Sequence, residues 1–210
     1  MKNSPFFTVV MPSFLGHYPT AAKDRDQKIH RAIQSVIDQT FKSWQLIIVC
    51  DGCDQTFEII KAHYYDETRI DCYKIQKEPL WSGTPRNVGI AMAKGEYICY
   101  LDIDDFFGPN HLQIIHDGIQ NAAQKDWVWF DDYEGTRHGE FKRVKRDIYR
   151  RANHGTSNIC HLKDLAQWSA RGTYLHDFEF IMNLKKKSLN FSKIDLPQYY
   201  ICHVPNRVDI

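Results

Sequence analysis

The chain has 210 residues, with 27 basic and 26 acidic side chains and a formal net charge of +1. Hydrophobic residues make up 43% and aromatic residues 13%, which is too much apolar material and too little charge repulsion for a disordered chain. The length suits one domain, and the near-neutral charge argues against a surface built wholly for nucleic acid, although a local basic patch is compatible with it.

The sequence also bears on location. The longest apolar runs, such as Leu46–Cys50, are far shorter than the ~20 residues that a membrane-spanning helix needs. The first residues lead directly into a strand-like run, without the apolar segment and cleavage site of a secretory signal. We therefore expect a cytoplasmic location, with contact at the inner membrane surface as the alternative.

In the first half of the chain, apolar runs rich in β-branched residues alternate with segments of helical period, which is typical of parallel strands joined by crossover helices. The strand predicted at Gln45–Cys50 is apolar throughout, as expected of a strand buried on both faces. The predicted elements are a strand at Phe7–Met11, a helix at Asp26–Phe41, the strand at Gln45–Cys50, a helix capped by Asp54 and ending near Tyr65, a strand at Ile70–Ile75, a helix capped by Thr84 with Pro85 in its first position and Gly95 beyond its end, and a strand at Tyr97–Leu101.

The second half begins in the same way and then loses its periodicity. The segment Tyr133–His154 contains glycines, is rich in lysine and arginine and has no sustained period, so we expect a long basic loop there. The predicted elements are helices at Pro109–Ala123, Leu162–Ala170 and His176–Leu184 and strands at Trp127–Phe130 and Gln198–His203. Together the two halves predict a single α/β domain with a mostly parallel, mixed sheet flanked by helices.

Three predicted strands end on a carboxylate: Asp51, the cluster that begins at Asp102, and Asp131. In an open parallel sheet the carboxyl ends of the strands meet at one edge, where ligands bind. Carboxylates gathered there repel one another unless a cation or hydrogen-bond donors occupy the site. A hard divalent cation, Mg²⁺ or Mn²⁺, that holds a diphosphate is therefore our first hypothesis for this edge.

The same acidic residues have a plainer interpretation. Asp102 would cap a turn, and Asp104 and Asp105 would be solvated loop charges without a ligand. Their spacing leaves both interpretations open.

Five blocks of sequence, in their order, resemble the family 2 inverting glycosyltransferases of the A-type fold. The resemblance covers nearly the whole chain, and the ordered set is much more specific than a lone D-x-D triplet. The blocks are Thr8–Ser13, Ala32–Phe41, Leu46–Gly52, Pro85–Gly89 and Tyr100–Asp105.

The resemblance implies a nucleotide-binding part at about residues 1–105 and an acceptor-side part at about 106–210, with a flexible basic loop at about 133–155. In the family a strand-end Asp, here Asp51, reads the nucleobase, and a carboxylate can accept a hydrogen bond from an imide N–H. Arg86 would bind phosphate or ribose through its fixed fork of donors, unless it forms an ordinary surface ion pair. The residues implied at the nucleotide are Pro12, Ser13, Asp51, Arg86, Asn87 and Asp102.

A divalent metal, Mn²⁺ or Mg²⁺, is also implied by the resemblance. Asp104 would bind it directly, and His203 matches a late histidine that completes the metal site in many relatives. Asp102 would contact ribose or metal-bound water, and Asp105 would support the site or bind the metal as well. As a lone histidine, His203 is equally compatible with a structural role.

The residue implied as general base is Asp177, near the start of the last predicted helix. It would take a proton from the acceptor hydroxyl as the oxygen attacks the anomeric carbon. His176 stands where relatives usually carry an acid, which places it on the acceptor side. The plainer interpretation of Asp177 is a first-turn carboxylate favoured by the helix dipole.

The basic segment and several aromatic residues have open roles. Arg143 and Arg146 belong to a segment that would close over the donor as a lid or bind the acceptor, or would be a solvated loop or a patch for acidic lipid headgroups. Trp81 and Trp168 would stack on sugar rings or pack in the core. An insert after Ser13 lies near the expected nucleobase and would shape nucleotide choice or only extend the rim.

We therefore expect a metal-dependent inverting glycosyltransferase. It would move a hexosyl or N-acetylhexosaminyl group from a nucleoside diphosphate sugar, in the first instance a UDP-sugar, to a hydroxyl of a growing polysaccharide or a lipid-linked glycan. Nucleic acid is not an expected partner. The alternatives are a non-catalytic nucleotide-sugar-binding relative and a Mg²⁺-dependent phosphohydrolase that uses Asp102 and Asp104. A dinucleotide oxidoreductase is excluded because no G-x-G-x-x-G follows the first strand.

Overall fold

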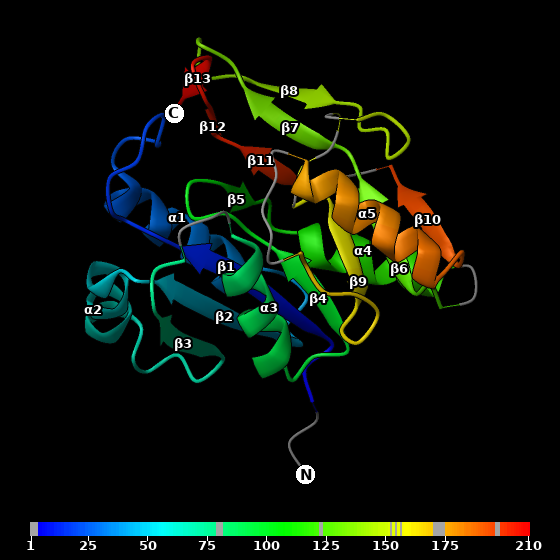
Figure 1. Cartoon of the computed structure of the whole chain (residues 1–210), viewed down its shortest axis with the longest axis horizontal. Coiled ribbons are helices and arrows are strands. Elements are labelled where there is room, and N and C mark those ends of the chain that lie inside the picture. The colour runs from blue at the N-terminus through cyan, green and yellow to red at the C-terminus, as the bar shows by residue number, and fades with distance from the viewer. Residues whose placement is uncertain are drawn as a thin grey trace.

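Within the residues that the structure describes, 4–78, 82–121, 124–151, 153, 155, 157–169, 175–195 and 198–210, a seven-stranded mixed sheet runs through the centre of the computed structural model (Figure 1). Its strands lie in the order β10 (Phe191–Ile194), β6 (Trp127–Phe130), β9 (Ile159–Leu162), β4 (Tyr97–Tyr100), β1 (Phe7–Ser13), β2 (Trp44–Asp51) and β3 (Ile70–Ile75).

The strand directions confirm the predicted mostly parallel, mixed sheet. β1 is parallel to both of its neighbours, β2 and β4, and β2 is parallel to β3. β9 runs antiparallel to β4 and β6, and β10 is parallel to β6. Because β1, β2 and β4 share one direction, Ser13, Asp51 and the residues after Tyr100 lie at the same edge of the sheet.

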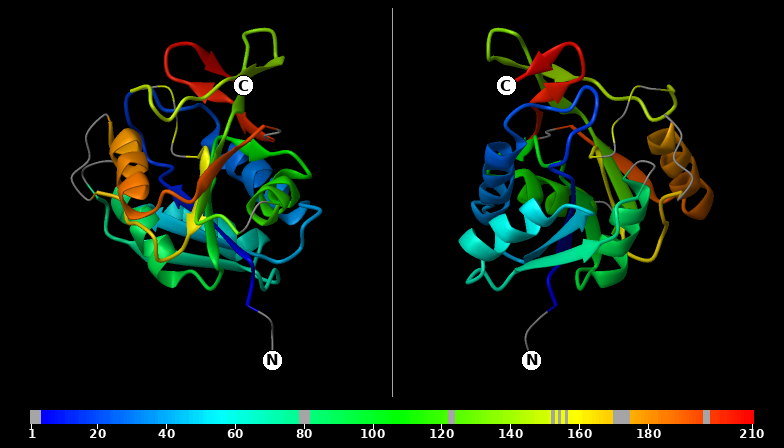
Figure 2. Two further views of the ribbon diagram at one scale, coloured as in Figure 1. Left: turned by 90° about the vertical axis from the view of Figure 1, so that its right-hand side faces the viewer. Right: turned by 60° about the vertical axis from the view of Figure 1, so that its left-hand side comes forward.

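Helices cover both faces of this sheet. They are α1 (Arg25–Ile37), α2 (Asp54–His63), α3 (Gly83–Met92), α4 (His111–Gln120) and α5 (His176–Lys187). Val9 and Met11 of β1 pack with the core that α1 and α4 cover, whereas Val10 packs with the core of α3 and α5. Figure 2 shows α1 and α5 on opposite sides of the sheet. None of the helices in the described ranges is long and apolar enough to cross a membrane.

A smaller sheet lies beside the carboxyl edge of the large one. It consists of β5 (Phe106–Phe107), β11 (Tyr199–Ile201), β7 (Asp132–Gly135) and β8 (Phe141–Val144), in that order, and a hairpin of β12 (His203–Val204) and β13 (Val208–Asp209) follows β11. Strands β7 and β8 form an antiparallel hairpin inside the segment predicted as a long basic loop. That prediction was wrong, because paired strands at the edge of a small sheet need no apolar run.

Other predictions were wrong in type or at their boundaries. The helix expected at Leu162–Ala170 is absent over residues 162–169, where β9 ends and turns follow. The strand expected at Gln198–His203 is interrupted at Cys202. Ser82 and Cys53 hold the cap positions expected for Thr84 and Asp54, without a side-chain cap bond at either. Pro85 still falls in the first helical turn, where its missing N–H has no intrahelical partner to lose.

Two buried histidines couple the stability of this fold to pH. Burial lowers the pKa of His111 to about 3 and the pKa of His161 to about 4. The ordinary histidine pKa of ~6.5 applies to the unfolded chain, so acidification protonates the unfolded state first. The contribution of these two histidines to stability is therefore full above about pH 6.5 and falls as the pH drops through that value toward the folded-state pKa.

We predict that His111→Phe reduces this acid sensitivity. The His111 ring stacks on Phe107 with 4.1 Å between centroids, so phenylalanine fits the same contact. Between pH 7.5 and pH 5, His111 alone should remove about 2 kcal/mol from the free energy of unfolding, and the variant should lack this loss. Urea unfolding at both pH values measures it. His138→Phe, at an exposed site, is the control; equal losses in the two variants would contradict the prediction.

Candidate active site

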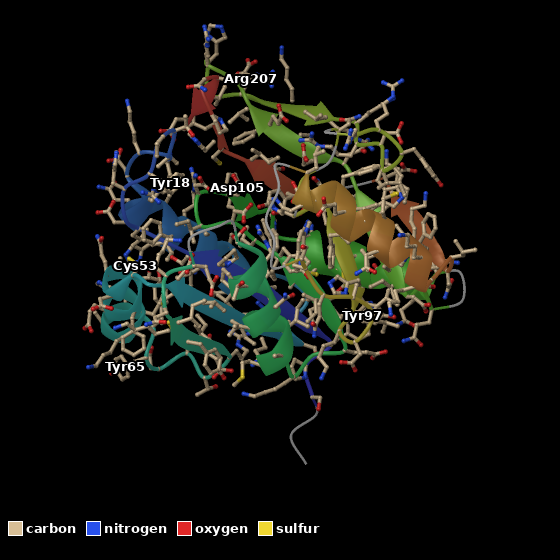
Figure 3. The ribbon with its side chains drawn as sticks, in the orientation of Figure 1. Tyr18, Cys53, Tyr65, Tyr97, Asp105 and Arg207 are labelled. Atoms are coloured by element: carbon tan, nitrogen blue, oxygen red, sulfur yellow. The ribbon has the colours of Figure 1, made fainter. Side chains whose placement is uncertain are left out.

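A cavity of about 700 Å³ opens at the carboxyl edge of the central sheet, within the size range of small-ligand sites. Figure 3 shows Asp105 on this side of the sheet and Tyr97, which begins β4, at the opposite end. The predicted residues that line the cavity are Pro12, Ser13, Asp51, Arg86, Asp102, Asp104, Asp105, His176, Asp177 and His203. The fold thus brings together groups from both halves of the chain.

Arg86 and Asp102 form the central ion pair of the cavity. Nη2 of Arg86 donates to Oδ1 of Asp102 at 3.0 Å, and the arginine is 2% exposed. Ser157 Oγ donates to the other carboxylate oxygen at 3.2 Å. Arg86 also contacts Ser82 Oγ and lies over the Trp168 ring, with Cζ 5.1 Å from its centroid. A buried guanidinium held in this way is a fixed site for an anion.

Asp104 and Asp105 follow Asp102 and have different surroundings. Asp105 is buried, and both of its oxygens accept hydrogen bonds, from the Tyr199 hydroxyl and the Cys202 N–H, each at 2.8 Å. Burial, with Asp104 and Asp102 nearby, raises the pKa of Asp105 well above its ordinary value. Asp104 faces the cavity, and burial and the neighbouring Asp102 raise its pKa. Asp105 is therefore a structural link to β11, and Asp104 is the carboxylate that would gain from a bound cation.

Asp51, at the end of β2, is 6% exposed. Its carboxylate accepts hydrogen bonds from Lys77 Nζ and from the Glu78 N–H, each at 2.7 Å. Each oxygen of the Asp51 carboxylate can accept a second hydrogen bond, so Asp51 can still accept a hydrogen bond from a ligand in the cavity.

The insert after Ser13 forms one wall of the cavity. Arg25, the first residue of α1, organises it by donating to the carbonyls of Gly16 at 2.6 Å and Ala22 at 3.1 Å. Its guanidinium also lies over the Tyr18 ring, 4.7 Å from the centroid. Phe14 and Tyr18 stack with 6.3 Å between centroids and both line the cavity. The insert therefore presents an aromatic surface to a ligand.

On the other side of the cavity, α5 begins with His176 and Asp177. The His176 Nε2 and the Asp177 Oδ1 lie 2.8 Å apart, and the Asp177 side chain is 24% exposed. The carboxylate sits at a helix N-terminus with one imidazole beside it. Such a group can accept a proton from a hydroxyl bound in the cavity.

His203 lines the cavity, but its ring faces the insert. Nε2 donates to the Thr20 carbonyl at 2.8 Å, and Nδ1 lies 3.6 Å from Asp209 Oδ1. Thr20 has a positive φ of 63°, unusual for a β-branched residue, and this hydrogen bond holds the strained turn. In this arrangement Nε2 is occupied as a donor, and Nδ1 is the ring nitrogen with a lone pair that could bind a metal. The role of His203 in metal binding stays a prediction.

Three predicted site residues do not line the cavity. Asn87 uses its whole side-chain amide on the backbone of Trp168. Arg143 donates twice to Asp131, at 2.8 and 3.0 Å. Arg146 donates to Asp132 at 2.6 and 2.9 Å and to Glu134 at 2.8 Å. The two arginines therefore anchor the β7–β8 hairpin to the sheet instead of forming a free lid.

Asp131 does not join the acids at the cavity as expected. It is 1% exposed, and Lys193 Nζ lies 2.6 Å from its Oδ1, while Arg143 binds its Oδ2. Lysine and arginine, not a metal, neutralise it.

The insert after Ser13 was expected near the nucleobase, and its Phe14 and Tyr18 line the cavity. Sequence reasoning missed Lys77, Ser157 and Tyr199, which come from separate segments. Each lies within two residues of a strand boundary, which was their one common signal. Trp81 lies outside the described residues, and Trp168 is 3% exposed in the core.

The donor set of the cavity suits a divalent cation in part. Asp102 and Asp104 supply hard oxygen ligands, and burial together with the neighbouring Asp102 raises the pKa of Asp104, so a nearby cation would stabilise its charged form. Across the described ranges, however, no three His, Cys, Asp or Glu side chains are already arranged around a metal position. Phosphate oxygens and water would have to complete the coordination, as is common for Mg²⁺.

Comparison with known sequences places the chain near one family. The sequence model described as glycosyl transferase family 2 matches residues 20–170. An uncharacterized glycosyltransferase of Methanocaldococcus jannaschii is 30% identical over 149 residues, which are 68% of this chain and 48% of that protein. The poly(ribitol-phosphate) beta-N-acetylglucosaminyltransferase TarP of Staphylococcus aureus is 30% identical over 119 residues, 55% of this chain and 34% of that protein. The chain thus spans less than half the length of these relatives.

Comparison with solved structures shows the same fold. The crystal structure of S. aureus TarS 1–349 matches with a TM-score of 0.75 and 18% identity, over 93% of this chain and 60% of that chain.

The contacts of Arg146 generate a stability prediction. Arg146→Met leaves Asp132, which is 0% exposed, without its cationic partner, and this should lower the free energy of unfolding by about 3 to 5 kcal/mol. Adding Asp132→Asn removes the buried charge and should recover part of the loss. Arg143→Met is the matched control, because Asp131 keeps Lys193. Urea unfolding measures all three variants, and equal losses from the two arginine changes would contradict the prediction.

Proposed function

The chain belongs to glycosyl transferase family 2 and has the A-type fold of that family, and on this premise we propose that it is an inverting transferase that moves a sugar from a UDP-sugar to an acceptor hydroxyl. The observation that supports the proposal is the shared cavity. It joins Arg86 and Asp102 from one half of the chain to Asp177 from the other. Family membership favours this function over the phosphohydrolase alternative.

The donor would lie across the carboxyl edge of the sheet. Asp51 would accept from an imide N–H of the base, Phe14 and Tyr18 would wall the ribose and base, and Arg86 would face the diphosphate. UDP is the preferred nucleotide because a solved structure of S. aureus TarS is a complex with UDP, and another is a complex with UDP-GlcNAc. The transferred sugar would be a hexosyl or N-acetylhexosaminyl group.

Asp102 and Asp104 would hold a divalent metal, Mn²⁺ or Mg²⁺, next to the diphosphate. When bound, the metal would neutralise charge on the leaving phosphates. His203 would join through Nδ1, with Nε2 still donating to the Thr20 carbonyl.

Asp177 would act as the general base. The acceptor oxygen attacks the anomeric carbon and forms the new C–O bond, the bond to the β-phosphate oxygen breaks, and the hydroxyl proton passes to Asp177. The nucleoside diphosphate leaves from the opposite face of the sugar, where Arg86 stabilises its growing negative charge. His176, 2.8 Å from Asp177, would orient the base on the acceptor side.

The acceptor would be a glycan or a lipid-linked saccharide. The relative TarP, by its name, acts on poly(ribitol-phosphate), which makes a polymer acceptor a reasonable first choice. This chain spans a minority of that protein's length, so acceptor binding would involve residues that the comparison does not cover.

We predict that Asp177→Asn abolishes transfer while donor binding persists. Loss of the base should lower kcat by about 10² to 10⁴, and the Kd for UDP should stay within about twofold. Release of UDP from a UDP-sugar panel, with acceptor or with water as the acceptor, measures turnover, and calorimetry measures Kd. Asp164→Asn, an exposed acid away from the cavity, is the control. Unchanged turnover in Asp177→Asn would refute the assigned base, and a wild-type chain that binds UDP without turnover would support the non-catalytic alternative.

A second prediction concerns the metal. UDP should stabilise the wild-type chain in thermal unfolding with Mn²⁺ present, and the stabilisation should largely disappear with a chelator, because a cation held by Asp102 and Asp104 would offset the negative charge of the diphosphate. Asp104→Asn should weaken Mn²⁺-dependent UDP binding at least about tenfold, since one charged ligand is lost. Asp164→Asn again serves as control. Equal stabilisation by UDP with and without metal would argue against metal dependence.

A further inference from the structure

Trp168 lies behind the cavity, and Asn87 of α3 holds its backbone. Asn87 Nδ2 donates to the Trp168 carbonyl at 2.8 Å, and the Trp168 N–H donates to Asn87 Oδ1 at 2.8 Å. A side-chain amide has one donor end and one acceptor end, and this pair of bonds uses both. The backbone of Trp168 is thereby fixed to the helix that carries Arg86.

A buried chain of hydrogen bonds fixes the Trp168 side chain. Its Nε1 donates to the Tyr100 hydroxyl at 2.9 Å, and that hydroxyl lies 2.6 Å from His161 Nε2. His161 Nδ1 lies 2.7 Å from the Leu162 carbonyl and must donate to it. The neutral imidazole therefore accepts from Tyr100 through Nε2, which leaves the tyrosine oxygen to accept from the indole. Every donor in the chain has its acceptor, which makes the arrangement rigid.

The Trp168 ring contacts both sides of the cavity. Arg86 lies over it, with Cζ 5.1 Å from the ring centroid. On the opposite side of the site, the centroid of the His176 ring lies 5.8 Å from the centroid of the Trp168 ring. Phe180 of α5 stacks on the indole, with 3.9 Å between the ring centroids and an interplanar angle of 7°. Trp168 itself does not line the cavity and is 3% exposed. It touches the groups assigned to donor and acceptor without being able to touch a ligand.

We infer that Trp168 is a positioning residue that sets Arg86 and the His176–Asp177 pair relative to each other, with Asn87 as its backbone anchor. The inference rests on the proposed function and adds to it a link between the donor side and the base. It also gives Asn87 a role different from nucleotide contact. A purely structural tryptophan would affect stability alone, whereas a positioning one affects donor affinity and the chemical step together.

The test measures the Kd for UDP with Mn²⁺ and kcat for UDP release, at a temperature well below the unfolding midpoint of each variant. Trp168→Leu removes the ring, and Asn87→Asp places a carboxylate oxygen against the Trp168 carbonyl. Each should lower kcat by about 10- to 100-fold, the cost of a small misplacement of reacting groups, and raise the Kd several-fold. Trp168→Phe keeps the stacking surface for Phe180 and should recover most of both losses.

A double-variant cycle tests the route of the effect. If Trp168 acts on the donor through Arg86, the combination of Arg86→Lys and Trp168→Leu should raise the Kd for UDP less than the product of the two single effects. Trp129→Leu is the matched control, because Trp129 lies on β6 with Lys193 over its ring and does not line the cavity. It should leave Kd and kcat unchanged.

The outcomes separate the inference from the function beneath it. A wild-type chain that neither binds UDP nor releases it from UDP-sugars would overturn the proposed function, and this inference with it. An active wild type whose Trp168 and Asn87 variants lose only thermal stability, or whose double variant is fully multiplicative, would overturn the inference alone. If Trp168→Leu fails to fold, Asn87→Asp carries the comparison of Kd, kcat and thermal stability.

Discussion

The structure depends on how it balances the carboxylates that parallel strands bring to one edge of the sheet. The balanced groups are Asp51 with Lys77, Asp102 with Arg86, Asp131 with Arg143 and Lys193, and Asp132 with Arg146. Asp104 and Asp177 differ from these. Asp104 faces the cavity with a raised pKa, and Asp177 has beside it a histidine, which is a cation only when protonated. Among the acids named here, all in the described part of the chain, the unbalanced ones are therefore those that a cation or a transferred proton would neutralise.

Burial on two faces explains which parts of the fold the sequence predicted. The strands β1, β2 and β3 were predicted from the sequence because a strand packed against a core on one or both faces needs apolar side chains there. β9 was missed because its sequence, Ile159–Leu162, includes a histidine that is 0% exposed and is made compatible with the core by Tyr100, 61 residues away. A partner so distant leaves no local signal. The polar β7–β8 hairpin was missed for a related reason, since its strands pair through the backbone and arginines contact the distant Asp131 and Asp132, which leaves no apolar pattern in the sequence.

The site shows the same difference between features with a local sequence pattern and features that depend on a distant partner. Asp51, Asp102 and Asp104 were expected near one cavity because they follow strand ends, and Asp177 was expected there because of the family resemblance; all four line the cavity. The contacts of a polar side chain could not be predicted in the same way. Asn87 follows Arg86 in the sequence, yet one side chain faces the cavity and the other binds a backbone 81 residues away. The chemistry of amide and guanidinium permits either choice, and only the tertiary contact decides.

The two parts predicted at about residues 1–105 and 106–210 both contribute to the core on each face of the sheet, and this determines how the site keeps its geometry. β9 of the second part pairs with β4 of the first, Asp105 binds the backbone of Cys202, and α5 packs through Phe180 and Ile181 against the strand face that α3 also covers. Sliding one part past the other would break a strand ladder and expose apolar side chains. The relative placement of Arg86 and Asp177 is therefore set by the packed interior, and the loops around the cavity are left to determine which ligands enter it.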